Sequence, residues 1–208
     1  MGIDIDIDNL MALGILNLRP MTRGGAVVGV RGESLSGRNR KFLYSMKGAG
    51  IHTIIDLRTA DHTRKFLPAC EALGLRYLNF PIDQAYTTDA EIIRDLPLMW
   101  NAMASGGFYI ACALGLHRTD MALALWFLFD PRAQEVPILP GHHREGVFKY
   151  EDIFRRANSV YRSLTPQGKA AWGWDEAFDG GFDGRKKQLT RVQKEYLAGG
   201  AHPLQERA

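Results

Sequence analysis

Residues 108–129 read FYIACALGLHRTDMALALWFLF, and this stretch decides the fold. Its first five residues, 108–112, are apolar and partly aromatic or β-branched, as is typical of a buried strand. A turn that contains Gly115 follows, and an apolar helix is predicted after Arg118. A strand that leads through a short turn into a helix is the connection from which α/β folds are built.

The same alternation of strands and helices extends to both sides of this stretch. Further strands are predicted at residues 26–30, 51–57 and 76–82. Helices are predicted within residues 36–49, 61–73, 89–103 and 153–164. This order predicts an α/β fold with a mostly parallel central sheet of about four to five strands, flanked by helices.

The chain length of 208 residues suits one domain with short additions at its ends. We expect the domain to cover residues 24–165. Ile and Asp alternate over residues 1–8, so residues 1–23 are predicted to form an N-terminal arm or an edge strand. Residues 166–208 are basic and rich in glycine, and we expect an extension that packs on the domain or is partly flexible.

Carboxylates at every second position would share one face of a strand and repel each other. Asp4, Asp6 and Asp8 are therefore expected to face solvent rather than to bind a cation.

The composition is that of an ordinary globular protein, with 46% apolar and 24% charged residues. No apolar run approaches the roughly 18 residues that a membrane span needs. We also find no basic segment followed by an apolar block, as in a signal peptide, at the start of the sequence. The two cysteines, Cys70 and Cys112, do not suggest a disulfide framework. Together these features predict a cytoplasmic protein that makes no contact with membranes.

The net charge of +3 comes from 26 basic and 23 acidic side chains, and the excess lies in the C-terminal third. Residues 185–194 hold a basic cluster that could contact nucleic acid. One short cluster in a nearly neutral chain is more typical of a solvated helix face, so we expect no nucleic-acid partner.

Cys112 and Arg118 are separated by five residues, between the end of a strand and the start of a helix. Ligands of open α/β sheets bind beyond the carboxyl ends of the strands. Backbone N–H groups and the positive end of the helix dipole make such a turn a cradle for an anion. A thiol in this position is stabilised as the thiolate, and Arg118 can bind two phosphate oxygens at once. Gly115 allows the backbone to wrap around the anion.

The segment from Cys112 to Thr119 resembles the Cys-x5-Arg signature loop of the protein tyrosine phosphatase superfamily, in the form Cys-x-x-Gly-x-x-Arg-Thr. Residues 50–59 are similar to the strand that follows the first helix of these enzymes, and residues 77–83 to the strand before their acid loop. Residues 28–31 match an early strand more loosely. The resemblance covers roughly residues 24–165. The order and spacing resemble those of the compact dual-specificity-like and bacterial tyrosine phosphatase branch.

The resemblance implies roles for individual residues. Cys112 is the nucleophile, Arg118 binds phosphate and Thr119 assists breakdown of the phosphocysteine. The loop residues that surround the phosphate are Ala113, Leu114, Gly115, Leu116 and His117. Asp83, 29 residues before Cys112, matches the general acid that later acts as base. Asp89, 23 residues before Cys112, is the alternative, although a helix cap explains it more simply.

The implied activity is hydrolysis of a phosphomonoester through a cysteinyl-phosphate intermediate, without metal or cofactor. Phosphotyrosine or mixed phosphoprotein substrates are implied, and phosphate-like anions would bind the loop. An inositol phosphate or another small phosphoester is the enzymatic alternative. Ala111 stands where the family has His, and Asp120 would bring a like charge near the phosphate, so a catalytically weak phosphate-binding module stays open. A rhodanese-like sulfurtransferase fits less well, because its loop resembles a spacing of four residues.

Other polar and aromatic residues carry weaker signals. Arg58, at a strand end, is predicted either to face the site or to form a structural ion pair. His142 and His143 are adjacent, which is a poor geometry for a shared metal, so no metal site is expected. The aromatic residues of 172–178 are predicted to pack on the core, with partner binding as the alternative. Cys70 is predicted to lie in the core.

Overall fold

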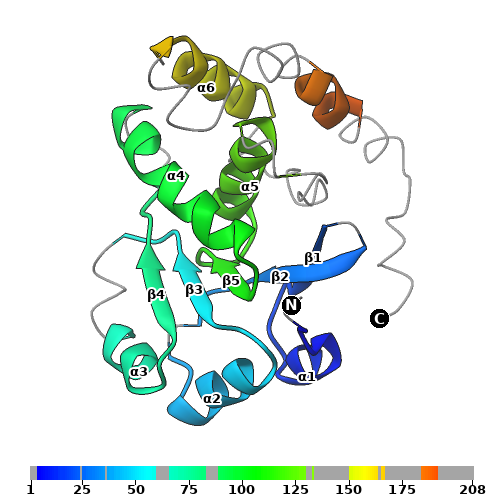
Figure 1. Ribbon diagram of the computed structural model, residues 1–208, viewed down its shortest axis with the longest axis vertical. Coiled ribbons are helices and arrows are strands. Elements are labelled where there is room, and N and C mark those ends of the chain that lie inside the picture. The colour runs from blue at the N-terminus through cyan, green and yellow to red at the C-terminus, as the bar shows by residue number, and fades with distance from the viewer. Residues whose placement is uncertain are drawn as a thin grey trace.

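A single sheet lies at the centre of the computed structural model (Figure 1). The structure describes residues 4–23, 25–35, 37–59, 66–82, 89–129, 133, 150–163, 165–166 and 184–191. Five strands are found within these ranges: β1 (Arg19–Arg23), β2 (Ala26–Gly32), β3 (Thr53–Asp56), β4 (Arg76–Asn79) and β5 (Phe108–Ala111).

The strands lie in the order β1-β2-β5-β3-β4. β1 runs antiparallel to β2, and all other neighbouring pairs are parallel. This arrangement confirms the predicted α/β fold with a mostly parallel sheet. Every residue of β3 and β5 is buried, because both strands lie inside the sheet and are covered by helices on both faces.

Helices cover the two faces of the sheet (Figure 1). One face packs against α1 (Ile7–Ala12), α2 (Arg40–Gly48) and α3 (Leu67–Ala72). The other face packs against α4 (Asp89–Ala104), α5 (His117–Phe129) and α6 (Tyr150–Ser163). Two separate hydrophobic cores result, one on each side of the sheet.

The helices follow the apolar patterns of the sequence. In α4 the residues at helical spacing, Leu96, Met99, Trp100 and Met103, are buried, and Pro97 lies within the helix. All residues of 121–129 in α5 are buried, which explains why this helix is apolar around its whole circumference.

The alternating Ile and Asp residues do not form a strand in the described part of residues 1–8. α1 begins at Ile7, and the Asp6 carboxylate caps it by accepting a hydrogen bond from Asn9 N at 2.9 Å. A short polar side chain before a helix competes well with strand pairing, which explains the error. The edge strand within residues 1–23 is β1 instead. Asp4, Asp6 and Asp8 are exposed, as predicted.

The basic cluster near the C-terminus is only partly a solvated face. Residues 184–191 are helical, and Leu189 is fully buried in the core beside α5. The Arg185 guanidinium donates to the carbonyl oxygens of Phe127 and Ala133, and it lies over the Phe127 ring. Lys187 and Arg191 are exposed. Arg185 therefore acts as a cation at the C-terminal end of α5, where the helix dipole favours positive charge.

Candidate active site

Residues 112–118, called the signature loop from here on, connect β5 to α5 at the carboxyl edge of the sheet. The last residue of β5, Ala111, lies in register with Gly32 of β2 and with Asp56 of β3. The ends of three neighbouring parallel strands therefore meet beside the loop, at the edge where α/β proteins bind ligands.

Exposure alternates along the signature loop. Cys112, Gly115 and Leu116 are buried, whereas Ala113 and Leu114 are exposed, Leu114 to 53%. Arg118 is half-buried in the first turn of α5. Cys112, the nucleophile proposed from the sequence, is thus buried at the base of the loop, whereas Leu114 lies at its exposed rim.

The carbonyl groups of the signature loop are held by donors from outside the loop. Four consecutive carbonyl oxygens, those of residues 113–116, each accept a hydrogen bond. The bonds run from Ser34 N to Ala113 O (3.1 Å), from Asn17 Nδ2 to Leu114 O (2.9 Å), from Arg31 Nη2 to Gly115 O (2.6 Å) and from Asp120 N to Leu116 O (2.7 Å).

These four bonds set the direction of the amide groups. No cis peptide bond occurs among the described residues, so each carbonyl points opposite to the N–H group of the same peptide. With the carbonyl groups of residues 113–116 held outward, the N–H groups of residues 114–117 point to the inner side of the loop. Several convergent N–H groups at the start of a helix form an anion-binding cradle.

Only glycine fits at position 115, for two reasons. Its φ of +68° lies in the left-handed region, where a side chain is strained. A Cβ atom would also meet the backbone carbonyl of Gly32 at the end of β2. The signature loop therefore packs directly against the end of β2.

Arg31 and Asp120 form an ion pair beneath the signature loop. Both side chains are 1% exposed, and the Arg31 Nη1 atom contacts the Asp120 Oδ1 atom. Arg31 comes from β2 and Asp120 from the first turn of α5. The sequence suggests that Asp120 brings an unfavourable charge toward a bound phosphate, and the contact with Arg31 offsets that charge.

Thr119 lies fully buried in the first turn of α5. Its Oγ1 atom has no hydrogen-bond partner among the described residues. Buried hydroxyl groups nearly always have a partner, so an unpartnered one calls for an explanation.

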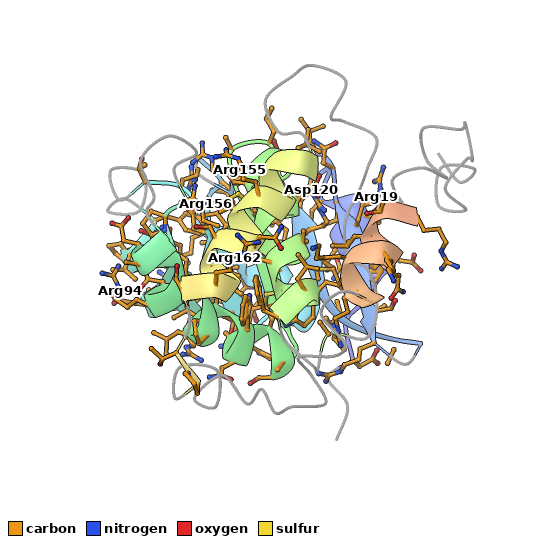
Figure 2. All side chains as sticks on the ribbon, turned by 90° about the horizontal axis from the view of Figure 1, so that it is seen from above. Arg19, Arg94, Asp120, Arg155, Arg156 and Arg162 are labelled. Carbon is orange, nitrogen blue, oxygen red and sulfur yellow. The ribbon has the colours of Figure 1, made fainter. Side chains whose placement is uncertain are left out.

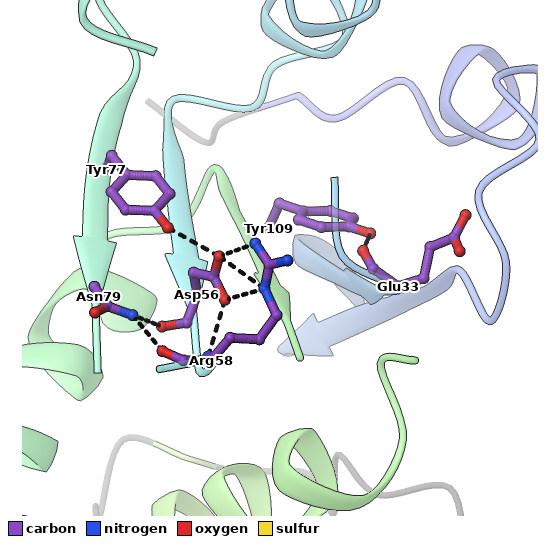
Figure 3. A network of polar contacts seen from close by, with 6 residues as sticks. All are labelled: Glu33, Asp56, Arg58, Tyr77, Asn79 and Tyr109. Carbon is purple, nitrogen blue, oxygen red and sulfur yellow. Dashed lines mark hydrogen bonds and ion pairs between the residues drawn. The ribbon is translucent and has the colours of Figure 1, made fainter. Parts of the chain in front are cut away.

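A second polar network lies at the ends of β3 and β4 (Figure 3). The Arg58 guanidinium binds the Asp56 carboxylate, with Nε to Oδ1 at 2.9 Å and Nη2 to Oδ2 at 2.5 Å. Tyr77 Oη donates to Asp56 Oδ2 at 2.8 Å. Asn79 Nδ2 donates to the backbone carbonyl oxygens of Asp56 and Arg58. The ion pair predicted for Arg58 is therefore present.

Burial and charge perturb the titration of this network. Burial lowers the pKa of Arg58, but the hydrogen bond and the charge of Asp56 outweigh it and raise the pKa overall. Burial, followed by the charge of Asp56, raises the pKa of Tyr77 well above its ordinary value. Tyr109, whose Oη donates to Glu33 O at 2.5 Å (Figure 3), has its pKa raised chiefly by burial. These groups keep their charge states across the physiological range.

The residues predicted from the sequence to form the site fall only partly within the described ranges. The backbone of residues 112–119 is described throughout. Asp83 lies outside the described residues. Asp89 is the first residue of α4, and its side chain, like that of His117, is not described. His142, His143 and the aromatic residues of 172–178 also lie outside the described ranges.

Three residues that hold the signature loop were missed by sequence reasoning: Asn17, Arg31 and Ser34. The sequence could have pointed to Arg31, since it is the one charged residue among the apolar residues of β2. No such signal marks Asn17, although its φ of +57° makes it the single described residue other than glycine in the left-handed region. A strained backbone of this kind is often found where a side chain is held for function.

The described residues contain neither a candidate metal site nor a candidate membrane-spanning helix. No group of three or more His, Cys, Asp or Glu side chains there could hold a metal ion. No described helix has the length and hydropathy needed to cross a membrane.

No family model and no curated protein sequence matches the chain, whereas solved structures do. A DUF442 protein from Shewanella putrefaciens CN-32, provisionally described as a phosphatase, superposes with a TM-score of 0.53 at 16% identity, over 77% of this chain and 97% of that chain. Kinase associated phosphatase (KAP) gives a TM-score of 0.47 at 14% identity, over 74% and 86%. TpbA of P. aeruginosa gives 0.45 at 19% identity, over 76% and 92%.

These likenesses concern the fold. The described residues have the α/β fold of the Shewanella protein, with a five-stranded sheet flanked by helices. The superposition covers nearly the whole length of the Shewanella protein.

Proposed function

We propose that this protein is a phosphomonoester hydrolase of the tyrosine or dual-specificity phosphatase type, acting through a cysteinyl-phosphate intermediate. The observation that carries the proposal is the direction of the signature-loop peptides. Four carbonyl groups are held outward, and the corresponding N–H groups face the side on which a phosphate would bind. Cys112 lies at the start of that loop, where a thiolate gains the same stabilisation as an anion.

The first chemical step transfers the phosphoryl group to Cys112. The thiolate sulfur attacks phosphorus, an S–P bond forms, and the bond from phosphorus to the ester oxygen breaks. Arg118 and the loop amides bind the equatorial oxygens, which carry the growing charge of the transition state. The carboxyl group of Asp83 donates a proton to the departing oxygen, so that an alcohol or phenol leaves.

The second step regenerates the enzyme. The Asp83 carboxylate takes a proton from water, whose oxygen attacks phosphorus as the S–P bond breaks. Inorganic phosphate leaves, and the sulfur returns to the thiolate. The buried Thr119 hydroxyl can donate a hydrogen bond to the sulfur as its negative charge returns, which fits a hydroxyl with no partner among the described residues.

We propose phosphotyrosine or mixed phosphoprotein substrates, with inositol phosphates as the enzymatic alternative. The described rim of the loop supports an aromatic or apolar ester group, because Leu114 and Leu16 are 53% and 61% exposed. Asn17, the neighbour of Leu16, is hydrogen-bonded to the Leu114 carbonyl, so the two leucines belong to adjoining segments. Both cysteines are free thiols, which agrees with a cytoplasmic location.

The test is hydrolysis of p-nitrophenyl phosphate from about pH 4.5 to 8 in the presence of EDTA. We expect turnover by the wild-type protein, loss of turnover in Cys112→Ser, and weakening of the acid-dependent limb of the pH profile in Asp83→Asn. Asp89→Asn is the matched control, since Asp89 begins α4 and is expected to leave that limb unchanged.

Two outcomes would contradict the proposal. Activity that survives in Cys112→Ser would show that the mechanism is wrong. A wild-type protein that binds vanadate without any hydrolysis would instead be a phosphate-binding module. A panel of phosphotyrosyl, phosphoseryl and inositol phosphate substrates then identifies the substrate class.

A further inference from the structure

Arg31 is the one charged residue of β2, and it lies at the end of that strand nearest the signature loop. Its side chain is 1% exposed. Burial of a guanidinium is costly unless ionic and hydrogen-bonding partners offset the lost hydration. A charged residue in this position therefore needs a reason beyond packing, because an apolar side chain would fill the space at lower cost.

The contacts of Arg31 supply that reason. Nη1 contacts the Asp120 carboxylate, and Nη2 donates to Gly115 O at 2.6 Å and lies 3.4 Å from Leu116 O. One planar guanidinium thus joins the signature loop to the first turn of α5. Lysine could not reproduce this arrangement, because an ammonium group lacks the rigid fork that reaches several acceptors at once.

We infer that Arg31 is a positioning residue for phosphate binding and that Asp120 is its charge partner. Arg31 keeps the Gly115 carbonyl turned away from the phosphate, so that the N–H of Leu116 faces it. The pair also leaves no net charge beneath the cradle. This inference rests on the proposed function, since it assigns Arg31 and Asp120 to the same phosphate-binding loop.

The inference predicts that the two partners have opposite effects. Arg31→Met removes the positive charge that contacts the buried Asp120 carboxylate, and the negative charge of Asp120 then repels a bound phosphate more strongly across a short distance of low dielectric. Asp120→Asn leaves the Arg31 cation beneath the loop and keeps an oxygen acceptor for it. Phosphate binding is therefore expected to weaken in the first variant and to stay equal or strengthen in the second. A pair that served stability alone would weaken binding in both.

The experiment measures binding of inorganic phosphate by calorimetry in the Cys112→Ser background, which separates binding from turnover. We expect the affinity to fall at least about tenfold in Arg31→Met, equivalent to about 1.4 kcal/mol. In Asp120→Asn it is expected not to fall. Arg31→Lys keeps the charge without the fork, so it is expected to recover most of the affinity but not the full kcat of the Cys112 enzyme.

Arg94→Met is the matched control. Arg94 forms an ion pair with Asp95 on α4 but is 69% exposed, and Figure 2 shows it at the edge of the molecule, whereas Asp120 lies inside. Loss of this pair is expected to leave phosphate affinity unchanged. Circular dichroism on each variant shows whether it is folded. If Arg31→Met does not fold, the phosphate affinities of Asp120→Asn and Arg31→Lys still test the inference.

The outcomes separate this inference from the proposed function. Equal losses of affinity in Arg31→Met and Asp120→Asn, or no change in either, would overturn the role given to Arg31. An active wild-type enzyme with such variants would still support the proposed function. If the wild-type protein has no turnover that depends on Cys112, yet Arg31 and Asp120 affect phosphate binding as described, the hydrolase proposal fails and the positioning role stands.

Discussion

Two regions of the molecule contain the same three kinds of side chain. The loop cluster consists of Arg31, Asp120 and Cys112, and the strand-end cluster consists of Arg58, Asp56 and Cys70. All six side chains are buried, and each arginine is paired with its aspartate. The two clusters nevertheless make different contacts, so the types of residue in a cluster do not by themselves determine its role.

The two clusters differ in the groups that their arginine side chains bind. Arg31 uses its second Nη atom to bind the backbone of the signature loop. Arg58 donates from Nε and Nη2 to the Asp56 carboxylate, and Tyr77 of β4 donates a hydrogen bond to the same carboxylate. The loop cluster thus orients a backbone toward a ligand, whereas the strand-end cluster ties neighbouring strands together.

The two cysteines give the largest expected contrast. Burial, followed by the charges of Asp56 and Glu71, raises the pKa of Cys70 to about 12. At pH 7 the thiolate fraction of such a group is about 1000-fold lower than that of an ordinary cysteine. Iodoacetamide is therefore expected to alkylate Cys112 in the native protein and Cys70 only after unfolding, as peptide mass spectrometry would reveal. Inorganic phosphate should protect Cys112 from alkylation. Equal labelling of both cysteines in the native protein would contradict the expected difference in reactivity.

A smaller but still large effect is expected from Gly115→Ala. The positive φ and the contact with the Gly32 carbonyl force the loop backbone to shift, which displaces the amides that bind phosphate. We expect kcat/KM to fall by about 100- to 1000-fold, as when an oxyanion donor is lost.

Gly50→Ala is the matched control for that substitution. Gly50 also has a positive φ, and its Cβ would meet the backbone carbonyl of Asp4, far from the loop in sequence and before the start of β3, at the amino edge of the sheet. It is expected to lower the melting temperature and leave kcat/KM of the folded protein within about threefold. Equal losses of kcat/KM in both variants would mean that the loop amides are not special.

The smallest effect on activity is expected from Arg58→Met. Loss of one partner from a buried ion pair leaves the Asp56 carboxylate uncompensated, so the free energy of unfolding should fall by about 3 kcal/mol. We expect kcat/KM to change by less than about fivefold, because the Arg58 guanidinium binds the Asp56 carboxylate rather than the backbone of the signature loop. Urea unfolding and p-nitrophenyl phosphate kinetics on the same samples provide both numbers. A large loss of kcat/KM with unchanged stability would assign Arg58 to the site instead.

Local patterns were enough to predict the order of strands and helices. The central strands were predicted within a few residues, since 51–57 contains β3 and 108–112 contains β5. The N-terminal alternation of Ile and Asp was misleading, because the Asp6 side chain caps a helix and so favours it over a strand. The charge of Arg185 was assigned to solvent, although tertiary contacts direct it to the end of α5.

The sequence alone determined the α/β class and the position of Cys112, Gly115 and Arg118 between a strand and a helix, because these depend on contacts within a few residues. Only the tertiary structure decided what holds the loop. The strand order places β2 beside β5, and this brings Arg31 against Gly115 and Asp120, more than 80 positions away. Such pairings depend on which strands become neighbours, and hydrophobic periodicity along one strand does not specify its neighbours.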